Sequence, residues 1–221
     1  MDFYLGFDPG GQKNFGWAVC SSMGSSLEVI ATGVADHARG AVDAAIASMP
    51  EKAEAIGAGI DAPLFWVEDG KRSIDKAIRN AIKRLGAPFP QGTVQQVNSL
   101  RGACLVQGVV VAKLLREHFH DIGITESHPK ALLYLLGITD QHRSPADVTI
   151  GDLSSYVIAR EKQVTSHERD AVLGSVSSWA QHKQLEGWKD LYREEKDPIS
   201  PFGYKPSYWM PWDLVGQENT T

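Results

Sequence analysis

The sequence is poor in cysteine and in long apolar runs. Its 221 residues include two cysteines, Cys20 and Cys104, and neither belongs to a Cys-x-x-Cys pair. This excludes a disulfide framework and a cysteine-based zinc cluster. No apolar run approaches the roughly 20 residues of a membrane span, and the first residues, Met-Asp-Phe-Tyr, lack the pattern of a signal peptide. We therefore expect a cytoplasmic protein that has no membrane partner.

The sequence also lacks a net positive charge. Its net charge of −5 argues against a protein that coats nucleic acid through general positive charge. Hydrophobic residues make up 43%, enough for the core of one compact domain. The charge is uneven, however, because residues 71–84 carry six basic residues against one acid, a local charge of +5. A single basic helix on an acidic body can guide a polyanion.

The pattern along the chain predicts an α/β protein. Short β-branched and aromatic runs alternate with helical periodicity in the order βββαβ…αβα, the order of a ribonuclease H-like fold. We predict a mixed five-stranded sheet, three strands antiparallel and two parallel, with helices on both faces. The predicted strands are 2–8, 15–21, 27–34, 55–61 and 121–126; the predicted helices are 41–49, 69–85, 98–118, 129–136, 149–161 and 166–186.

The expected domain organisation is simple. Residues 1–186 form the ribonuclease H-like domain, with a helical insertion at about 66–97. Residues 187–221 are rich in proline and tryptophan, and we expect them to form an extended tail that packs on the domain.

Four acidic residues stand at the ends of the predicted elements. Asp8, Asp61 and Glu126 each end a strand, and Asp170 lies near the start of the last long helix. A carboxylate at the end of a buried strand is costly unless a cation compensates it, and four converging carboxylates would repel one another. Divalent metal is the usual remedy, so the pattern predicts a site for Mg²⁺ or Mn²⁺. The alternatives are turn capping for Asp8 and Asp61 and a helix-dipole role for Asp170.

Period-two alternation shows which residues lie on the same strand face as Asp61 and Glu126. Gly57 and Gly59 lie on the same side of their strand as Asp61, and they leave space for a ligand or a closely packed helix. Glu126 instead continues an apolar face made by Ile122 and Ile124.

One histidine accompanies the acid on the last helix. Thr165 and Glu168 match a helix capping box, which gives Glu168 a structural role. His167 and Asp170 are spaced i, i+3, on a face with the small residue Gly174. We interpret His167 as a residue that orients a water or accepts a proton.

Five further residues are candidates for contacts with an anionic substrate. Arg72, Lys76 and Arg79 recur at helical spacing in the basic stretch that follows Asp61. A charged helix of this kind is more often only a solvated face, and a lone histidine in a turn is more often structural. The candidates for substrate binding are Arg72, Lys76, Arg79, Arg101 and His128.

Taken together, these segments resemble a domain-of-unknown-function family of predicted nucleases with the ribonuclease H-like fold. The matching motifs are Gly6-Phe7-Asp8, Ile60-Asp61-Ala62-Pro63, Arg72-x-x-Asp75-x-x-x-Arg79, Arg101-Gly102, Glu126-x-His128-Pro129 and Asp170-Ala171. The run Gly6-Phe-Asp-Pro-Gly followed by Gly16-Trp-Ala-Val is also similar to the first hairpin of Holliday-junction resolvases. The resemblance implies an acidic metal site, and nucleic acid or another phosphodiester as the substrate.

The resulting hypothesis is a metal-dependent phosphodiester hydrolase of the nuclease type. Asp8 would bridge two metal ions about 3.5–4 Å apart, and Asp61, Glu126 and Asp170 would complete their coordination. An alternative enzyme is an ATPase or kinase of the actin and sugar-kinase type, although only one copy of the fold is present. A second alternative, from a different class, is a non-catalytic module that binds nucleic acid or protein.

Overall fold

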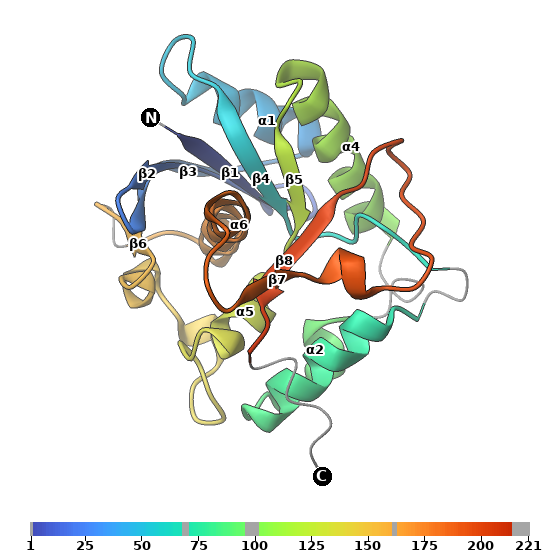
Figure 1. The fold of residues 1–221 in the computed structure, drawn as a ribbon. Helices are drawn as coiled ribbons and strands as arrows, with labels where there is room; N and C mark the ends of the chain where they lie inside the picture. The colour runs from blue at the N-terminus through green and yellow to red at the C-terminus, as the bar shows by residue number, and fades with distance from the viewer. Residues whose placement is uncertain (1, 68–70, 96–101, 161–162, 214–221) are drawn as a thin grey trace.

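The computed structural model describes residues 2–67, 71–95, 102–160 and 163–213, and it contains one mixed sheet with helices on both faces (Figure 1). Among the described residues the strand order is β6-β3-β2-β1-β4-β5-β8-β7. The strands are β1 (Phe3–Asp8), β2 (Phe15–Met23), β3 (Ser26–Ala35), β4 (Ala55–Ile60), β5 (Gly123–Glu126), β6 (Val157–Ile158), β7 (Trp188–Asp190) and β8 (Ser207–Pro211). The helices are α1 (Ala38–Ala47), α2 (Ser73–Arg84), α3 (Pro90–Thr93), α4 (Gly102–His118), α5 (Pro129–Leu135) and α6 (Ser166–Lys183).

The five predicted strands are all present, but the predicted number of strands is wrong. β1, β2 and β3 pair antiparallel, while β4 and β5 continue the sheet parallel to β1, as expected. Three further strands extend the sheet at both ends: β6 pairs with β3, and β8 joins β5 in parallel and carries β7. The described part of the predicted tail, 187–213, therefore contributes two strands to the sheet.

One predicted helix is also wrong. The structure has no α-helix over 149–160; it has a 3₁₀ helix, η3 (Ile150–Leu153), then a turn, then β6. The reason is local, because Thr149 and Asp152 close a capping box on a single turn, with Gly151 inside it. The other predicted helices are confirmed within a few residues at their ends where they are described. None of the described helices is long and apolar enough to cross a membrane.

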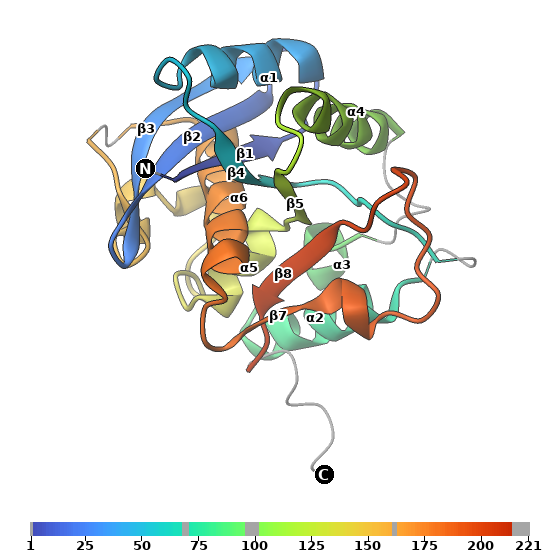
Figure 2. The ribbon, with the colours of Figure 1, turned by 45° about the horizontal axis from the view of Figure 1, so that its top comes forward.

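Alternation along the strands separates two hydrophobic layers. Phe3, Leu5 and Phe7 of β1 pack on the side covered by α1 and α4, whereas Tyr4 packs on the side of α6 (Figure 2). By the same alternation Gly6 and Asp8 belong to the α6 side.

Helix α6 lies directly on the backbone of the two central strands. A Cβ atom added at Gly6 would overlap the carbonyl oxygen of Ala171, and one added at Gly59 would overlap that of Gly174. Only glycine permits this approach. It brings the first turns of α6 to the edge of the sheet where β1 and β4 end.

Candidate functional site

Three of the predicted acids lie together where β1, β4 and α6 meet. β1 and β4 are parallel neighbours, so Asp8 at the end of β1 and Asp61 directly after β4 emerge at the same edge. Asp170 reaches this edge from the first turns of α6. Burial raises the pKa of Asp61 to about 8, and the negative charges of Asp8 and Asp170 add to that effect against the opposing charge of His128. The three carboxylates therefore repel one another.

His167 pairs with the first of these carboxylates. Its Nδ1 donates to Oδ2 of Asp8 at 2.6 Å, and this hydrogen bond raises the pKa of the imidazole. The pair joins α6 to the end of β1. The raised pKa favours the protonated form of His167, whose positive charge would oppose that of Asp8.

Arg169 holds the carboxylate that comes from α6. Its Nε and Nη2 donate to Oδ1 of Asp170 at 3.0 and 2.6 Å, and its Nη1 donates to the carbonyls of Pro145 and Val148. Burial still raises the pKa of Asp170, with the charge of Asp8 acting in the same direction and Arg169 opposing it. Sequence reasoning missed Arg169, because residues adjacent in a helix ordinarily point in different directions.

Lys130 is a second residue that sequence reasoning missed. It is exposed in the first turn of α5, and its positive charge acts on Asp61, His167 and Asp170. It belongs to the surroundings of the carboxylates, although the sequence offers no signal for this beyond its position four residues after Glu126.

Asp61 has no strong partner. Its side chain is 24% exposed, and among the described residues it accepts no hydrogen bond; its nearest cationic group is Nδ1 of His128, at 3.7 Å. Asp8 and Asp170 each accept a hydrogen bond from a basic side chain, whereas Asp61 has only the longer contact with His128. Hard divalent cations take carboxylate oxygens, so Asp8, Asp61 and Asp170 supply the type of donor atom that Mg²⁺ or Mn²⁺ prefers. Among the described residues, however, the group whose ligand atoms lie within 4.8 Å of one another is Asp75, Glu126 and His128.

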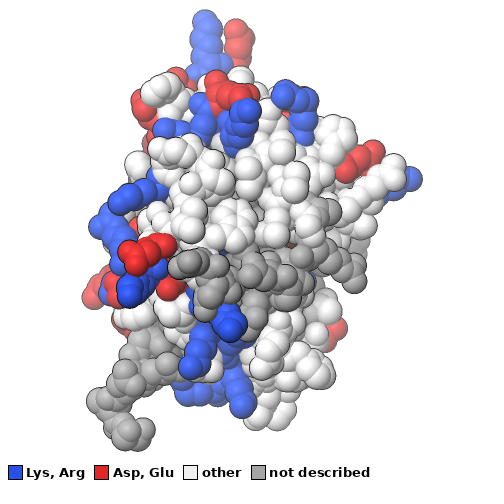
Figure 3. Space-filling model, turned by 90° about the vertical axis from the view of Figure 1, so that its right-hand side faces the viewer, with Lys and Arg blue, Asp and Glu red and all other residues white. Residues whose placement is uncertain are grey.

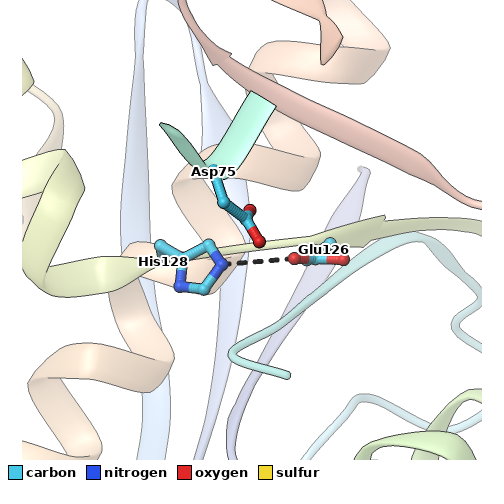
Figure 4. Close-up of side chains that lie close together, drawn as sticks. All are labelled: Asp75, Glu126 and His128. Carbon is cyan, nitrogen blue, oxygen red and sulfur yellow. Dashed lines mark hydrogen bonds and ion pairs between the residues drawn. The ribbon is translucent and has the colours of Figure 1, made fainter. Parts of the chain in front are cut away.

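Glu126 lies in a separate buried cluster next to this site (Figure 4). Asp75, Glu126 and His128 each offer a ligand atom, and these atoms lie within 4.8 Å of one another. Nε2 of His128 donates to Oε1 of Glu126 at 3.2 Å, and the backbone N–H of Leu64 donates to Oε2 at 2.9 Å. Alternation explains the separation, because Glu126 belongs to the face of Ile124, opposite α6.

Arg72 fills the cationic position of this cluster. It donates to both oxygens of Glu126, at 2.6 and 2.8 Å, and to both oxygens of Asp75, at 2.9 and 3.0 Å. Its guanidinium lies 4.5 Å from the ring centre of Phe65 and 5.6 Å from that of Tyr208. Burial opposes the charge of Glu126, but Arg72 and the hydrogen bond from His128 lower its pKa to about 2. Since the guanidinium of Arg72 already bonds both oxygens of each carboxylate, a metal at Asp75, Glu126 and His128 would have to displace it.

The predicted substrate contacts occupy different environments. Arg72 is 1% exposed, so its side chain offers no surface to a substrate. Lys76 is exposed on α2, and Arg79 is half-buried, with Nη1 donating to the carbonyl of Val94 at 3.0 Å. His128 is buried between Asp61 and Glu126 and links the two clusters. Arg101 lies outside the described residues.

Comparison with known proteins gives a distant structural similarity. No protein-family model matches the sequence, and no curated protein matches it. Two solved structures of Thermus thermophilus RuvC are similar to this chain at 11% sequence identity. The one in complex with a Holliday junction substrate has a TM-score of 0.41 and covers 79% of this chain and 90% of its own. The other has a TM-score of 0.42 and covers 82% and 96%.

The raised pKa of Asp61 predicts a pH-dependent penalty in metal-free protein. The carboxyl group of Asp61 has a pKa near 4 in the unfolded chain and about 8 in the folded one, so the folded state keeps this proton to a higher pH. The stability that the bound proton contributes is therefore lost as the pH rises from about 4 to about 8. In EDTA at pH 8.5 we expect Asp61→Asn to raise the free energy of unfolding by about 2 kcal/mol, which raises Tm by roughly 4–8 °C. At pH 4.5 the same substitution should change Tm little.

The control is Asp43→Asn, on the exposed face of α1. Differential scanning calorimetry at both pH values measures the difference. An equal change in Tm at pH 4.5 and pH 8.5 would contradict the assignment of this charge to Asp61.

Proposed function

We propose that the protein is a divalent-metal-dependent phosphodiester hydrolase whose metal is held by Asp8, Asp61 and Asp170. The observation that carries this proposal is the convergence of three carboxylates from β1, β4 and α6, one of which, Asp61, accepts no hydrogen bond among the described residues. The resemblance of the sequence motifs to predicted nucleases with a ribonuclease H-like fold supports the same class. A nuclease is the form of this activity that we favour.

The residues around the metal ligands have distinct roles in this proposal. A bound Mg²⁺ or Mn²⁺ would supply Lewis-acid activation of the phosphodiester and of a water. His167 holds Asp8 through its Nδ1 and is 36% exposed, so it can orient a water or exchange a proton at the site. Arg169 fixes Asp170, and His128 approaches Asp61 from the side of the Arg72 cluster. Glu126 acts by anchoring that cluster, since Arg72, His128 and a backbone N–H already occupy its oxygens.

The exposed face of α2 supports a polyanionic substrate. The one acid of this helix, Asp75, is turned inward to Arg72, so the exposed charges of α2 are all basic, among them Lys76 and Lys83. Lys and Arg side chains gather in the lower part of Figure 3, the region of α2. On a chain of net charge −5, such a face favours local contacts with a phosphate backbone.

The direct test is calorimetric titration of Mg²⁺ and Mn²⁺ into wild type, Asp8→Asn and Asp43→Asn at pH 7. We expect saturable binding by wild type and Asp43→Asn, and at least about tenfold weaker binding by Asp8→Asn, because a ligand charge is lost. Since Asp61 must give up its proton to a metal, we also expect proton release. The heat at pH 7 should therefore depend on the ionisation enthalpy of the buffer, and less so at pH 9.

Two outcomes would contradict the proposed metal site. One is the absence of saturable binding by wild type, and the other is equal binding by wild type and Asp8→Asn. Hydrolysis by the metal-loaded protein is then tested on bis(p-nitrophenyl) phosphate and on single-stranded, duplex and four-way-junction DNA and RNA. The substrates that are cleaved identify the substrate class of the proposed hydrolase.

A further inference from the structure

A cavity lies at the opposite edge of the sheet from the carboxylates of Asp8 and Asp61. It has a volume of about 770 Å³ and is lined by the end of α4, the starts of β5 and β8, the end of α6 and part of the segment 190–207. β5 and β8 run parallel and their starts line this cavity, while the opposite ends of β4 and β5 lead to Asp61 and Glu126. Its volume lies in the range of pockets for small organic ligands.

Two cations of this cavity have no acidic partner among the described residues. Arg116 donates from Nη1 to the carbonyl of Ile122 at 3.1 Å and lies 4.8 Å from the ring centre of Tyr204. Lys205 is exposed and lines the cavity, and it makes no hydrogen bond or ion pair within the described residues. Neither positive charge is neutralised by a neighbouring carboxylate.

The acids that line the cavity are occupied. Asp190 accepts from the backbone N–H groups of Tyr192 and Tyr208 and pairs with Arg193 at 3.3 Å. Glu195 accepts hydrogen bonds at the start of α2, from the Ser73 hydroxyl at 3.0 Å and the Ile74 N–H at 3.2 Å. Asp121 is fully exposed and pairs with His120. Arg116 and Lys205 are therefore the cations of the lining that none of these acids holds.

Two neutral polar atoms of the lining also lack partners. The hydroxyl of Tyr204 and Oε1 of Gln181 are buried, and neither has a hydrogen-bond partner among the described residues. Burial raises the pKa of Tyr204 to about 12, so its hydroxyl remains a donor at neutral pH. Buried polar groups without partners are costly, and a polar ligand would satisfy both.

We propose that this cavity binds an organic anion of about mononucleotide size, with its phosphate or carboxylate group on Arg116 and Lys205. Tyr204 and Gln181 then bond the polar body of the ligand. Phosphate and carboxylate share the chemistry that the two cations recognise, namely charged acceptor oxygens. The site is separate from the carboxylates of Asp8 and Asp61 and needs no metal.

Calorimetric titration in EDTA tests this site, with AMP, UMP and citrate as probes. The proteins are wild type, Lys205→Gln, Tyr204→Phe and Asp8→Asn, with Lys196→Gln as the matched control. Lys196 is an exposed lysine of the same segment that does not line the cavity. We expect saturable binding by wild type, weakened about tenfold by Lys205→Gln, weakened by Tyr204→Phe, and unchanged by Lys196→Gln.

Tighter binding of the nucleotides assigns the anion as a phosphate, and tighter binding of citrate assigns it as a carboxylate. The proposal is overturned if none of the probes binds saturably at millimolar concentration, or if Lys205→Gln and Tyr204→Phe bind like wild type. Binding that persists in Asp8→Asn separates this site from the proposed metal site, so either can fail without the other.

Discussion

Hydrolysis of bis(p-nitrophenyl) phosphate by Asp8→Asn is expected to fall at least about 10³-fold below that of wild type in saturating Mn²⁺. The substitution removes a ligand charge from the proposed metal site and replaces the acceptor of His167. A metal ion stabilises the charge that develops in the transition state by several kcal/mol, and about 4 kcal/mol corresponds to a factor of about 10³ in rate. The measurement is the initial rate over a range of Mn²⁺ concentrations.

Two comparisons separate a catalytic loss from a folding defect. Asp43→Asn, on the other face of the sheet, should retain the wild-type rate, and the Tm of Asp8→Asn in EDTA should remain within a few degrees of wild type. A folded Asp8→Asn protein that hydrolyses the substrate at the wild-type rate would refute the assignment of Asp8.

The largest effect on stability is expected for Arg72→Gln. Arg72 compensates Glu126 and Asp75, which are almost fully buried; its removal leaves Asp75 without this cation and Glu126 with only the hydrogen bond from His128. Breaking a buried ion pair from one side costs about 3–5 kcal/mol, which for a chain of this size lowers Tm by roughly 6–20 °C. Thermal unfolding measured by circular dichroism gives this value directly.

The pH dependence identifies the cause of that loss. Without Arg72, burial raises the pKa of both carboxyl groups, so the folded state holds protons and loses stability as pH rises above about 4. The deficit of Arg72→Gln should therefore be smaller at pH 5 than at pH 8. Lys76→Gln, an exposed change on α2, should alter Tm by at most about 1–2 °C. A deficit of equal size at both pH values would point to lost packing on Phe65 and Tyr208 instead.

The sequence predicted the centre of the fold because its signals there are local. Period-two alternation and turn residues marked the five central strands, and the glycines beside Asp61 predicted the close approach of a helix. The same alternation placed Glu126 on the face of Ile122 and Ile124, which was already a signal that it would not join Asp8. The prediction instead grouped Glu126 with the other acids because each stands at the end of a strand or the start of a helix.

The remaining features depend on contacts between distant segments. β8 pairs with β5 far along the chain, and the Ser207 hydroxyl donates to the carbonyl of Ile124 across 83 positions. The proline-rich flanks of β8 instead suggest an extended tail. The contact of Arg72 with Glu126 likewise spans 54 positions, a separation that local periodicity does not reveal. From the sequence alone, a basic residue at the start of a charged helix such as Arg72 is expected to be exposed to solvent, and only the tertiary structure shows that it is buried.

The parallel junction of β5 and β8 sets an order of events during folding. The N–H of Trp209 donates to Thr125 across 84 positions, and contacts of such separation form after local ones because the closing of a long loop must come first. The ring of Tyr208, beside Arg72 and His128, arrives with the same strand. Until it docks, the charges of Arg72 and Glu126 remain hydrated. We therefore expect the dehydration of Arg72 and Glu126 to accompany the docking of this strand rather than to precede it.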